Sequence, residues 1–358
     1  MTSRVEGVRR IAVLRPNAVG DFVFALPALQ ALREAYPHAH IVLLGKRWHR
    51  EFLTGRPGPW DEVIALPPMP GVGAPPDTVP DEDEVQRCLQ GLRERRFDLA
   101  IQLFGGGRFS NPFVESLGAR VTAGLQADDA PPLQRNLRYT PWRNERARLL
   151  EVVARVGARA PDELSPRLAV IERDRVELRS VAPTLDGRPL VVLQPGATDA
   201  RRRWPVEHFA AVGDALAAEG AQLAINGGPD EVALGAALAG RLGAPVLDLS
   251  GRLGMDGLAA LLERAAVVVS NDTGPLHLAQ AVGTRTVGVY WFLNLLVSGP
   301  LVGGRHREAF SARIHCPVCG RENLRERCEH DVPFVGDVRV EEVLGLARAA
   351  LAEARQAG

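Results

Sequence analysis

The chain has 358 residues, enough for about two domains, and its 46% hydrophobic and 24% charged residues are typical of a globular protein with a sizeable core. Its 43 basic and 43 acidic residues cancel, which excludes a general attraction to nucleic acid or to anionic lipid. No apolar run reaches the ~18 residues of a membrane span, and the N-terminal run is too short for a signal peptide, so we expect a cytoplasmic protein with reduced cysteines.

In the first half of the chain, short apolar runs alternate with amphipathic stretches, which predicts βα units and a parallel sheet. The predicted strands span residues 10–15, 40–44, 62–66, 98–104 and 120–125. Apolar positions recur at helical spacing in three stretches, residues 22–35, 82–96 and 143–156. Residues 67–80 are rich in proline and glycine and predict a surface loop, and the polar residues 157–189 predict a linker that contains a short strand.

The alternation restarts in the second half, with predicted strands at residues 190–194, 222–226, 246–249, 266–270 and 286–290. The predicted helices span residues 206–219, 230–242, 255–264, 275–282 and 340–355. The sequence therefore predicts an α/β protein with two doubly wound, Rossmann-like domains that face a central cleft, where small-molecule sites tend to lie. The expected boundaries are 1–158 for the N-terminal domain, 159–189 for the linker, 190–338 for the C-terminal domain and 339–358 for a closing helix.

The turn at residues 15–21, RPNAVGD, lies between the first predicted strand and the first predicted helix. In a doubly wound sheet such a turn lies at the carboxyl edge of the strands. Gly20 permits close approach of the backbone, and Asp21 at the helix start offers a carboxylate that can take a proton from a nucleophilic hydroxyl. The alternative is that Asp21 simply caps the helix. The turn lacks the G-x-G-x-x-G pattern of a dinucleotide site.

Two turns of the second half have features of a nucleotide site. Residues 194–205, QPGATDARRRWP, place the Thr198 hydroxyl and a run of arginines that includes Arg202 ahead of a helix, a combination that binds phosphate. A solvated arginine run is the alternative. Residues 227–231, GGPDE, place Glu231 where a carboxylate accepts hydrogen bonds from ribose hydroxyls, although the helix dipole alone also favours a carboxylate there.

A third turn, residues 270–277 with the sequence SNDTGPLH, is the most informative. It crowds Asp272, Thr273, Gly274 and His277 into one strand-to-helix connection, where the helix dipole points at whatever binds. The amides of Thr273 and Gly274 are placed to hold a pyrophosphate, with His277 one helical turn away. The alternative for His277 is a buried histidine bonded to the backbone.

The cysteines near the C-terminus suggest a metal knuckle. The close pair Cys316 and Cys319, followed by Cys328, supplies three ligands, and His315 or His330 is the candidate for the fourth. Buried thiols without a metal are the alternative. Because the knuckle lies outside the three turns, we expect any metal held there to be structural.

Several common catalytic motifs are absent from the sequence. It contains no Walker A motif and no G-x-S-x-G nucleophile elbow. The Asp-x-Asp pair formed by Asp81 and Asp83 lies in a charged loop ahead of a helix, which is a poor place to chelate a metal pyrophosphate. Arginines and helix dipoles are therefore expected to neutralise a phosphate leaving group.

Residues 11–27, IAVLRPNAVGDFVFALP, resemble the start of the ADP-heptose:lipopolysaccharide heptosyltransferases, glycosyltransferase family 9. The same family is resembled by QPGAT at 194–198, RWP at 203–205 and SNDTGPLHLA at 270–279, in the right order over roughly residues 10–290. The resemblance implies a GT-B fold, with the acceptor on the N-terminal domain and the donor nucleotide on the C-terminal one. It also implies inverting transfer of heptose from ADP-heptose to an acceptor hydroxyl of the lipopolysaccharide core or a related glycan, with no metal required for catalysis.

By position, the resemblance makes Asp21 the catalytic base. In the family, the residues at positions 198 and 202 contact the donor phosphates, and position 202 is usually lysine. The residue at position 231 lies near the adenosine ribose. The loop at 272–274 holds the sugar and pyrophosphate, and a histidine follows it. The implied donor-binding residues are Thr198, Arg202, Glu231, Asp272, Thr273, Gly274 and His277. The ending with Cys316, Cys319 and Cys328 resembles one found in some members and in related protein heptosyltransferases, where it can hold iron, so a structural zinc or iron is expected there.

The acceptor is less defined than the donor. The basic residues of the N-terminal half are nearly all arginines, such as Arg108, Arg135, Arg138 and Arg143, and they suit a phosphorylated lipid core, a protein or a small molecule. We expect a glycan or glycolipid acceptor, no nucleic acid, and peripheral contact with the inner membrane. One alternative is the same fold with another nucleotide-sugar donor, such as a UDP-hexose. A second alternative is an inactive nucleotide-binding partner module, and the intact Asp21 argues against this second one.

Overall fold

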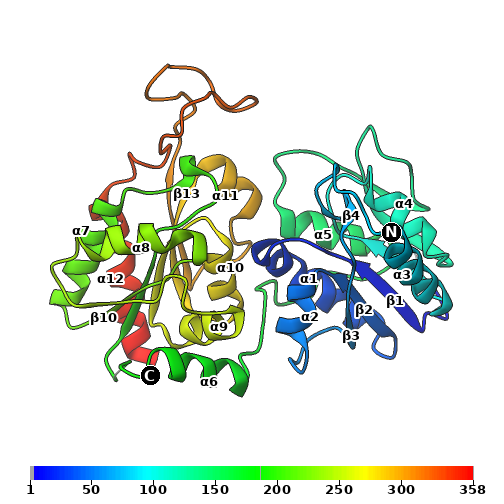
Figure 1. The fold of residues 1–358 in the computed structure, drawn as a ribbon, viewed down its shortest axis with the longest axis horizontal. Coiled ribbons are helices and arrows are strands. Elements are labelled where there is room, and N and C mark those ends of the chain that lie inside the picture. The colour runs from blue at the N-terminus through cyan, green and yellow to red at the C-terminus, as the bar shows by residue number, and fades with distance from the viewer. Residues whose placement is uncertain (1–3, 186, 358) are drawn as a thin grey trace. The chain divides into compact units, whose positions relative to one another are not determined.

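The computed structural model describes residues 4–185 and 187–357, which form two compact units that divide between Ala169 and Val170 (Figure 1). Each unit contains its own six-stranded sheet in which all neighbouring strands are parallel. Helices connect most successive strands in each unit, as the alternating sequence pattern predicts for βα units, and β7 and β8 are joined by a loop.

The N-terminal unit has the strand order β3-β2-β1-β6-β7-β8. Its strands are β1 (Arg10–Leu14), β2 (His40–Gly45), β3 (Glu62–Ala65), β6 (Leu99–Gln102), β7 (Val121–Gln126) and β8 (Arg135–Arg138). Its helices are α1 (Val19–Ala35), α2 (Arg47–Leu53), α3 (Glu82–Glu94), α4 (Ser110–Ser116) and α5 (Glu145–Ala154). The central strands are continuous apolar runs that are buried on both faces, as in sheets covered by helices on both sides.

The C-terminal unit repeats this plan with the order β11-β10-β9-β12-β13-β14. Its strands are β9 (Leu190–Gln194), β10 (Gln222–Ile225), β11 (Val246–Asp248), β12 (Val267–Asn271), β13 (Arg285–Trp291) and β14 (His306–Ser311). Its helices are α6 (Glu172–Val181), α7 (Val206–Ala218), α8 (Val232–Ala239), α9 (Met255–Arg264), α10 (Gly274–Ala281), α11 (Phe292–Ser298) and α12 (Val340–Ala357). Two short 3-10 turns, η1 (Ala200–Arg202) and η2 (Pro229–Glu231), precede α7 and α8.

Both sheets reverse their strand order at the centre, between β1 and β6 in the first and between β9 and β12 in the second. In sequence order within each unit this is 3-2-1-4-5-6, the Rossmann order, in which ligands bind outside the carboxyl ends of the strands at the reversal. The turn with Asp21 follows β1, the turn with Thr198 follows β9, and Asp272 follows β12. The fold thus places three of the turns selected from the sequence at the two reversal points.

The structure differs from the sequence prediction in residues 157–189, where the predicted short strand is replaced by the helix α6. The helix was not predicted because its sequence is mostly polar and shows no apolar face. Of its ten residues only Asp174 and Leu178 are buried, and the Asp174 side chain accepts a hydrogen bond from the Ile171 backbone at 2.9 Å. The residues predicted as one surface loop, 67–80, contain a short parallel pair, β4 (Met69–Pro70) and β5 (Gly73–Ala74). No helix in the described ranges is long and apolar enough to cross a membrane.

Candidate functional site

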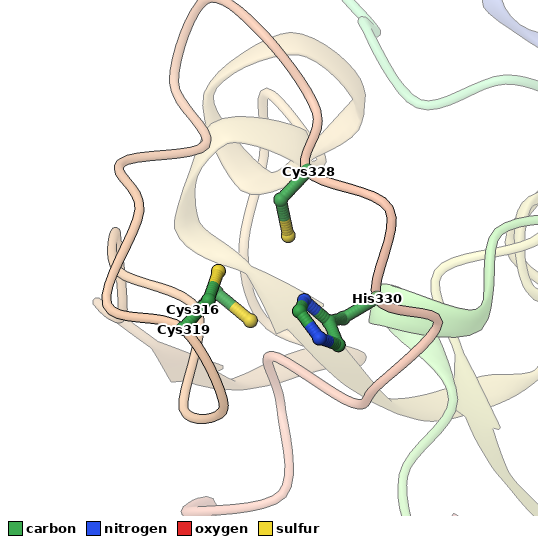
Figure 2. Close-up of side chains that lie close together, drawn as sticks. All are labelled: Cys316, Cys319, Cys328 and His330. Atoms are coloured by element: carbon green, nitrogen blue, oxygen red, sulfur yellow. The ribbon is translucent and has the colours of Figure 1, made fainter.

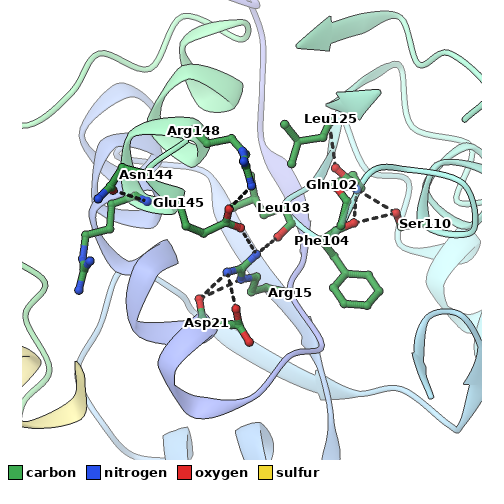
Figure 3. A network of polar contacts seen from close by, with 12 residues as sticks. Arg15, Asp21, Gln102, Leu103, Phe104, Ser110, Leu125, Asn144, Glu145 and Arg148 are labelled. Atoms are coloured by element: carbon green, nitrogen blue, oxygen red, sulfur yellow. Dashed lines mark hydrogen bonds and ion pairs between the residues drawn. The ribbon is translucent and has the colours of Figure 1, made fainter. Parts of the chain in front are cut away.

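Asp21 lies in the first turn of α1, and its side chain is 41% exposed. The guanidinium of Arg15, which follows β1, lies directly behind it and is only 1% exposed. Arg15 Nη2 is 3.7 Å from the Asp21 carboxylate, and Nε and Nη2 also donate to the Asp21 backbone carbonyl at 3.0 and 2.7 Å (Figure 3). The carboxylate is therefore oriented by a buried cation on one side and open to solvent on the other. The N-cap of α1 is Ala18, and among the described residues no side chain caps this helix by a hydrogen bond, so Asp21 does not act as its cap.

Arg15 is itself fixed by a wider network of buried charges. Its Nη1 donates to the Leu103 carbonyl and, at 3.2 Å, to the Glu145 carboxylate, which is 13% exposed. Glu145 also pairs with Arg148 on the same helix, α5, where the Arg148 side chain is 5% exposed. The Asn144 side chain caps α5 by accepting from the backbone of Arg146 and Ala147. Figure 3 shows Glu145 of α5 and the Leu103 carbonyl, after β6, meeting at Arg15, with Arg148 on the other side of Glu145.

In the C-terminal unit, the turn after β12 brings together several of the predicted donor-binding residues. Asp272 is 2% exposed, and its Oδ1 contacts His277 Nε2 at 3.0 Å and accepts from Ser298 Oγ at 2.9 Å. Arg202 Nη1 donates to Oδ2 of the same carboxylate at 3.2 Å and to its backbone carbonyl at 3.0 Å. His277 is buried, and its Nδ1 lies 3.4 Å from Gln280 Oε1.

Burial would raise the pKa of Asp272, but the hydrogen bond and charge of His277, the charge of Arg202 and the hydroxyl of Ser298 together hold it below the usual range. The carboxylate is therefore ionised at neutral pH. Thr273, the N-cap of α10, uses no side-chain hydrogen bond as a cap, and it and Gly274 are half-buried. Their amides belong to the first turn of α10, where a helix leaves backbone donors unsatisfied.

Trp204 explains why Arg202 reaches Asp272. Its side chain is 1% exposed, and its indole Nε1 donates to the Val338 carbonyl at 2.9 Å. Its backbone N–H donates to the Asn271 side chain at 3.0 Å, at the end of β12. These bonds hold the segment after η1 against the turn that contains Asp272. The short spacing between Arg202 and the Trp204-Pro205 pair therefore follows from the packing of Trp204.

The other two predicted donor residues belong to the turns after β9 and β10. The Glu231 carboxylate accepts from the Gly228 backbone at 2.9 Å and from Gln194 Nε2 at 3.3 Å, and it lies against Gly196, where a Cβ would overlap it. Glu231 therefore joins the turn after β10 to the turn after β9. Thr198, in the latter turn, is exposed.

The three C-terminal cysteines lie in the loop between β14 and α12, which Figure 1 shows projecting from the sheet. Figure 2 shows the side chains of Cys316, Cys319, Cys328 and His330 pointing toward one another, and their ligand atoms all lie within 4.8 Å of each other. Of the two histidines left open by the sequence, His330 is the fourth member of the cluster, and His315 forms a β-bridge with Glu322. Hydrogen bonding from the His330 backbone lowers the pKa of the Cys328 thiol to about 6.

Two side chains of these sites, Ser298 and Glu145, were not predicted from the sequence. Ser298 lies on α11, which the sequence pattern did not predict, and it is 26 residues from the carboxylate it contacts. Glu145 is 130 residues from Arg15. Neither lies in a motif, and no local signal connects either one to its partner.

Residues 85–302, more than half of the chain, match the family model of glycosyltransferase family 9 (heptosyltransferase). The chain belongs to glycosyltransferase family 9. It is 29% identical over 301 residues to lipopolysaccharide heptosyltransferase 2 of Salmonella typhimurium, which covers 78% of this chain and 82% of that protein.

Two solved structures of the heptosyltransferase family share the fold. A family 9 glycosyltransferase from Veillonella parvula has a TM-score of 0.77 at 21% identity, over 96% of this chain and 97% of that one. The ADP-heptose lipopolysaccharide heptosyltransferase II of E. coli has a TM-score of 0.75 at 20% identity, over 97% of this chain and 99% of that one. The two Rossmann-like units are thus those of a GT-B glycosyltransferase, which confirms the fold class and the enzyme class predicted from the sequence.

Proposed function

We propose that this family 9 enzyme transfers a heptose from ADP-heptose to a hydroxyl of a lipopolysaccharide-core acceptor, with inversion at the anomeric carbon. The single observation that carries the proposal is Asp21, a half-exposed carboxylate at the reversal point of the N-terminal sheet, oriented by the buried Arg15. A carboxylate with one open face is available to a substrate hydroxyl, whereas a residue that only capped α1 would be bonded to its backbone.

In the proposed reaction Asp21 takes the proton of the acceptor hydroxyl as its oxygen attacks the anomeric carbon of the heptose. The bond from that carbon to the diphosphate breaks on the opposite face, which inverts the configuration, and ADP leaves. Arg202 and the amides of Thr273 and Gly274 stabilise the charge that grows on the diphosphate. Glu231 accepts hydrogen bonds from the ribose, and Thr198 donates to a donor phosphate.

The N-terminal unit would bind the acceptor and the C-terminal unit the donor. No cation is needed for the leaving group in this scheme, because a guanidinium and a helix N-terminus supply the positive charge. Among the described residues, one group of three or more His, Cys, Asp or Glu side chains has metal-ligand geometry, and it is the cysteine cluster. Its three thiols and one imidazole would complete a tetrahedral shell and leave no open position for substrate.

Titration calorimetry with ADP, UDP and GDP, each with and without EDTA, tests the donor. Selective ADP binding that EDTA leaves unchanged is expected. Preference for UDP or GDP would move the donor to another nucleotide sugar, and no nucleotide binding would overturn the transferase proposal.

Asp21→Ala tests the base. Its transfer rate from ADP-heptose should fall at least about 100-fold, the smaller end of what a positioned general base contributes, with ADP affinity unchanged. Asp128→Ala is the matched control, since Asp128 is a 92% exposed aspartate in the same unit. A near-normal rate in Asp21→Ala would end the assignment.

We further propose that Cys316, Cys319, Cys328 and His330 hold one structural zinc or iron ion. The ion would cross-link the loop between β14 and α12, and the free thiols fit the cytoplasmic location expected from the sequence. Elemental analysis of the purified full chain should find about one metal per chain, with occupancy lost in Cys328→Ser and kept in Cys88→Ser, which alters the cysteine outside the cluster. Equal metal content in the two variants would refute the site.

A further inference from the structure

The loop between β14 and α12, residues 312–339, contains the cysteine cluster and is called the cysteine loop below. It packs against η1, the turn that carries the proposed donor-phosphate residue Arg202. The Phe334 backbone N–H donates to the Arg201 carbonyl at 2.8 Å, and Arg327 Nη1 lies 3.9 Å from the Asp199 carboxylate. With the bond from the Trp204 indole to the Val338 carbonyl, three separate positions of the cysteine loop contact the short stretch around η1.

Asp199 determines the shape of this turn. It is the N-cap of η1: its side chain accepts from the Arg201 backbone N–H at 3.0 Å, and its carbonyl accepts from the Arg202 backbone N–H at 3.0 Å. Burial would raise the pKa of Asp199, but hydrogen bonds from Arg201 and the charges of Arg201 and Arg327 hold it below its usual range. The carboxylate is therefore ionised, and it pairs with Arg327 while it caps the turn that orients Arg202.

Aromatic packing joins the cysteine loop to the same turn. Phe334 is fully buried, and its ring centroid lies 5.3 Å from that of Trp291 at the end of β13. The guanidinium of Arg201, in η1, lies over the other ring of this pair, 5.1 Å from the Trp291 centroid. A change in the position of the cysteine loop would therefore be transmitted to η1 through packing as well as through hydrogen bonds.

The cysteine cluster determines where Arg327 lies. Arg327 directly precedes Cys328, whose backbone N–H donates to Asn323 Oδ1 at 3.2 Å. Cys316 and Cys328 are 2% and 5% exposed, and they belong to the same buried core as Trp204. An ion held by the cluster, as proposed above, would cross-link two stretches of the loop within one residue of Arg327.

We propose that the cysteine loop supports the donor site, with Arg327 as a positioning residue that holds Asp199 and thereby η1 and Arg202. The cysteine cluster in turn keeps Arg327 in place, so affinity for the donor diphosphate depends on a loop that is not itself proposed to contact the donor. This inference rests on the proposed function and deepens it by giving the cluster a role in donor binding. Such coupling is reciprocal, so bound ADP should also stabilise the cluster.

The first test compares Arg327→Ala and Arg327→Lys with two controls. Arg325→Ala removes an exposed arginine from the same loop, and Asp331→Asn removes the other ion-pair partner of Arg327, which is 70% exposed. Arg327→Ala should raise the dissociation constant of ADP, measured by calorimetry, about fivefold, and Arg327→Lys should restore most of the affinity. The KM for the acceptor, which the other unit is proposed to bind, and Tm should match those of the controls.

The second test concerns the cluster. A closed shell of four ligands offers EDTA no open position, so the cluster is emptied by substitution rather than by the chelator of the donor titration. Cys328→Ser should lose its metal and raise the dissociation constant of ADP at least as much as Arg327→Ala, whereas Cys88→Ser should change neither. In the wild-type protein, saturating ADP should slow the release of the metal about threefold or more when the thiols are titrated with a mercurial, a measurement that needs no turnover and no variant.

Two outcomes would overturn the inference: an ADP dissociation constant of Arg327→Ala within twofold of that of Arg325→Ala, or a rate of metal release that ADP leaves unchanged. A lowered Tm in Arg327→Ala without rescue of ADP affinity in Arg327→Lys would also overturn it, because the arginine would then only stabilise the fold. Wild-type protein that binds no nucleotide would instead overturn the proposed function. Wild-type protein without metal would refute the metal site and with it the role of the cluster, so these failures are distinguishable.

Discussion

The buried charge network behind Asp21 makes a sharp prediction for Glu145→Gln. Glu145 bridges Arg15 and Arg148, whose side chains are 1% and 5% exposed, so the variant leaves two buried guanidiniums without their shared carboxylate. Breaking a buried pair costs about 3–5 kcal/mol, and we take about 3 because glutamine keeps the shape and one hydrogen-bond acceptor. For a unit of this size 1 kcal/mol corresponds to roughly 2–4 °C, so Tm should fall by about 6–12 °C.

Glu151→Gln is the matched control, with the same substitution on the same helix. Glu151 pairs with Arg143, and both side chains are substantially exposed, at 43% and 36%. Exposed pairs contribute about 0–1 kcal/mol, so its Tm should change by less than about 4 °C. Differential scanning calorimetry of the full chains provides the comparison. If Glu145→Gln melts within 2 °C of Glu151→Gln, the reasoning that burial makes this network stabilising is wrong.

Three further predictions concern other parts of the molecule. Gly196→Ala should lower ADP affinity about tenfold or more by calorimetry, because the new methyl overlaps the Glu231 carboxylate; unchanged affinity would remove Glu231 from the proposed donor site. In the folded protein burial lowers the pKa of His49 to about 3, against an ordinary 6.5, so between these pH values only the unfolded state binds a proton on this ring. The free energy of unfolding should therefore decrease as the pH is lowered from 6.5, by up to about 1.4 kcal/mol per pH unit. His49→Gln should lose this pH dependence. Asp272 has a lowered pKa, so its stabilisation is fully present above the ordinary 3.8 and declines as pH falls below it. Asp272→Asn should be less stable than wild type at pH 7, and the difference between their denaturation midpoints should shrink as pH falls below 3.8; a constant difference would contradict the ionised state.

The fold was predictable from sequence where a strand is a continuous apolar run. Residues 190–194 are all buried and form the strand β9 at the predicted bounds, and the helix α9 also spans the predicted residues. Short or polar elements were not predicted, because a helix of seven residues such as α2 has too few turns to show a helical period in its apolar residues. The helix α6 was not predicted for another reason. Polar side chains occupy most of its surface, and its ion pair from Arg175 to Glu263 is a tertiary contact that the local sequence does not reveal.

The candidate sites divide in the same way. Asp272 and His277 lie five residues apart in one turn, so their contact follows from local geometry and was foreseeable as a cluster. The resemblance assigned Arg202 to the same donor site, but its contact with Asp272, 70 residues away, was not predicted. The contribution of Ser298 depends on how α11 packs, which no local pattern encodes. A cavity lined by Pro16, Lys46, Ala65 and Glu84 in the N-terminal unit is likewise a property of four segments that meet only in the folded unit.

Arg202 has a consequence for the thermodynamics of donor binding. Its guanidinium is already held by two oxygens of Asp272, and its side chain is 21% exposed. A free arginine loses up to about 2 kcal/mol of rotamer entropy when it is immobilised. In this protein most of that loss occurs as the chain folds, so a diphosphate that reaches Arg202 meets a guanidinium already confined to one orientation. Binding through this side chain should therefore carry a smaller entropic penalty than binding through a flexible surface arginine.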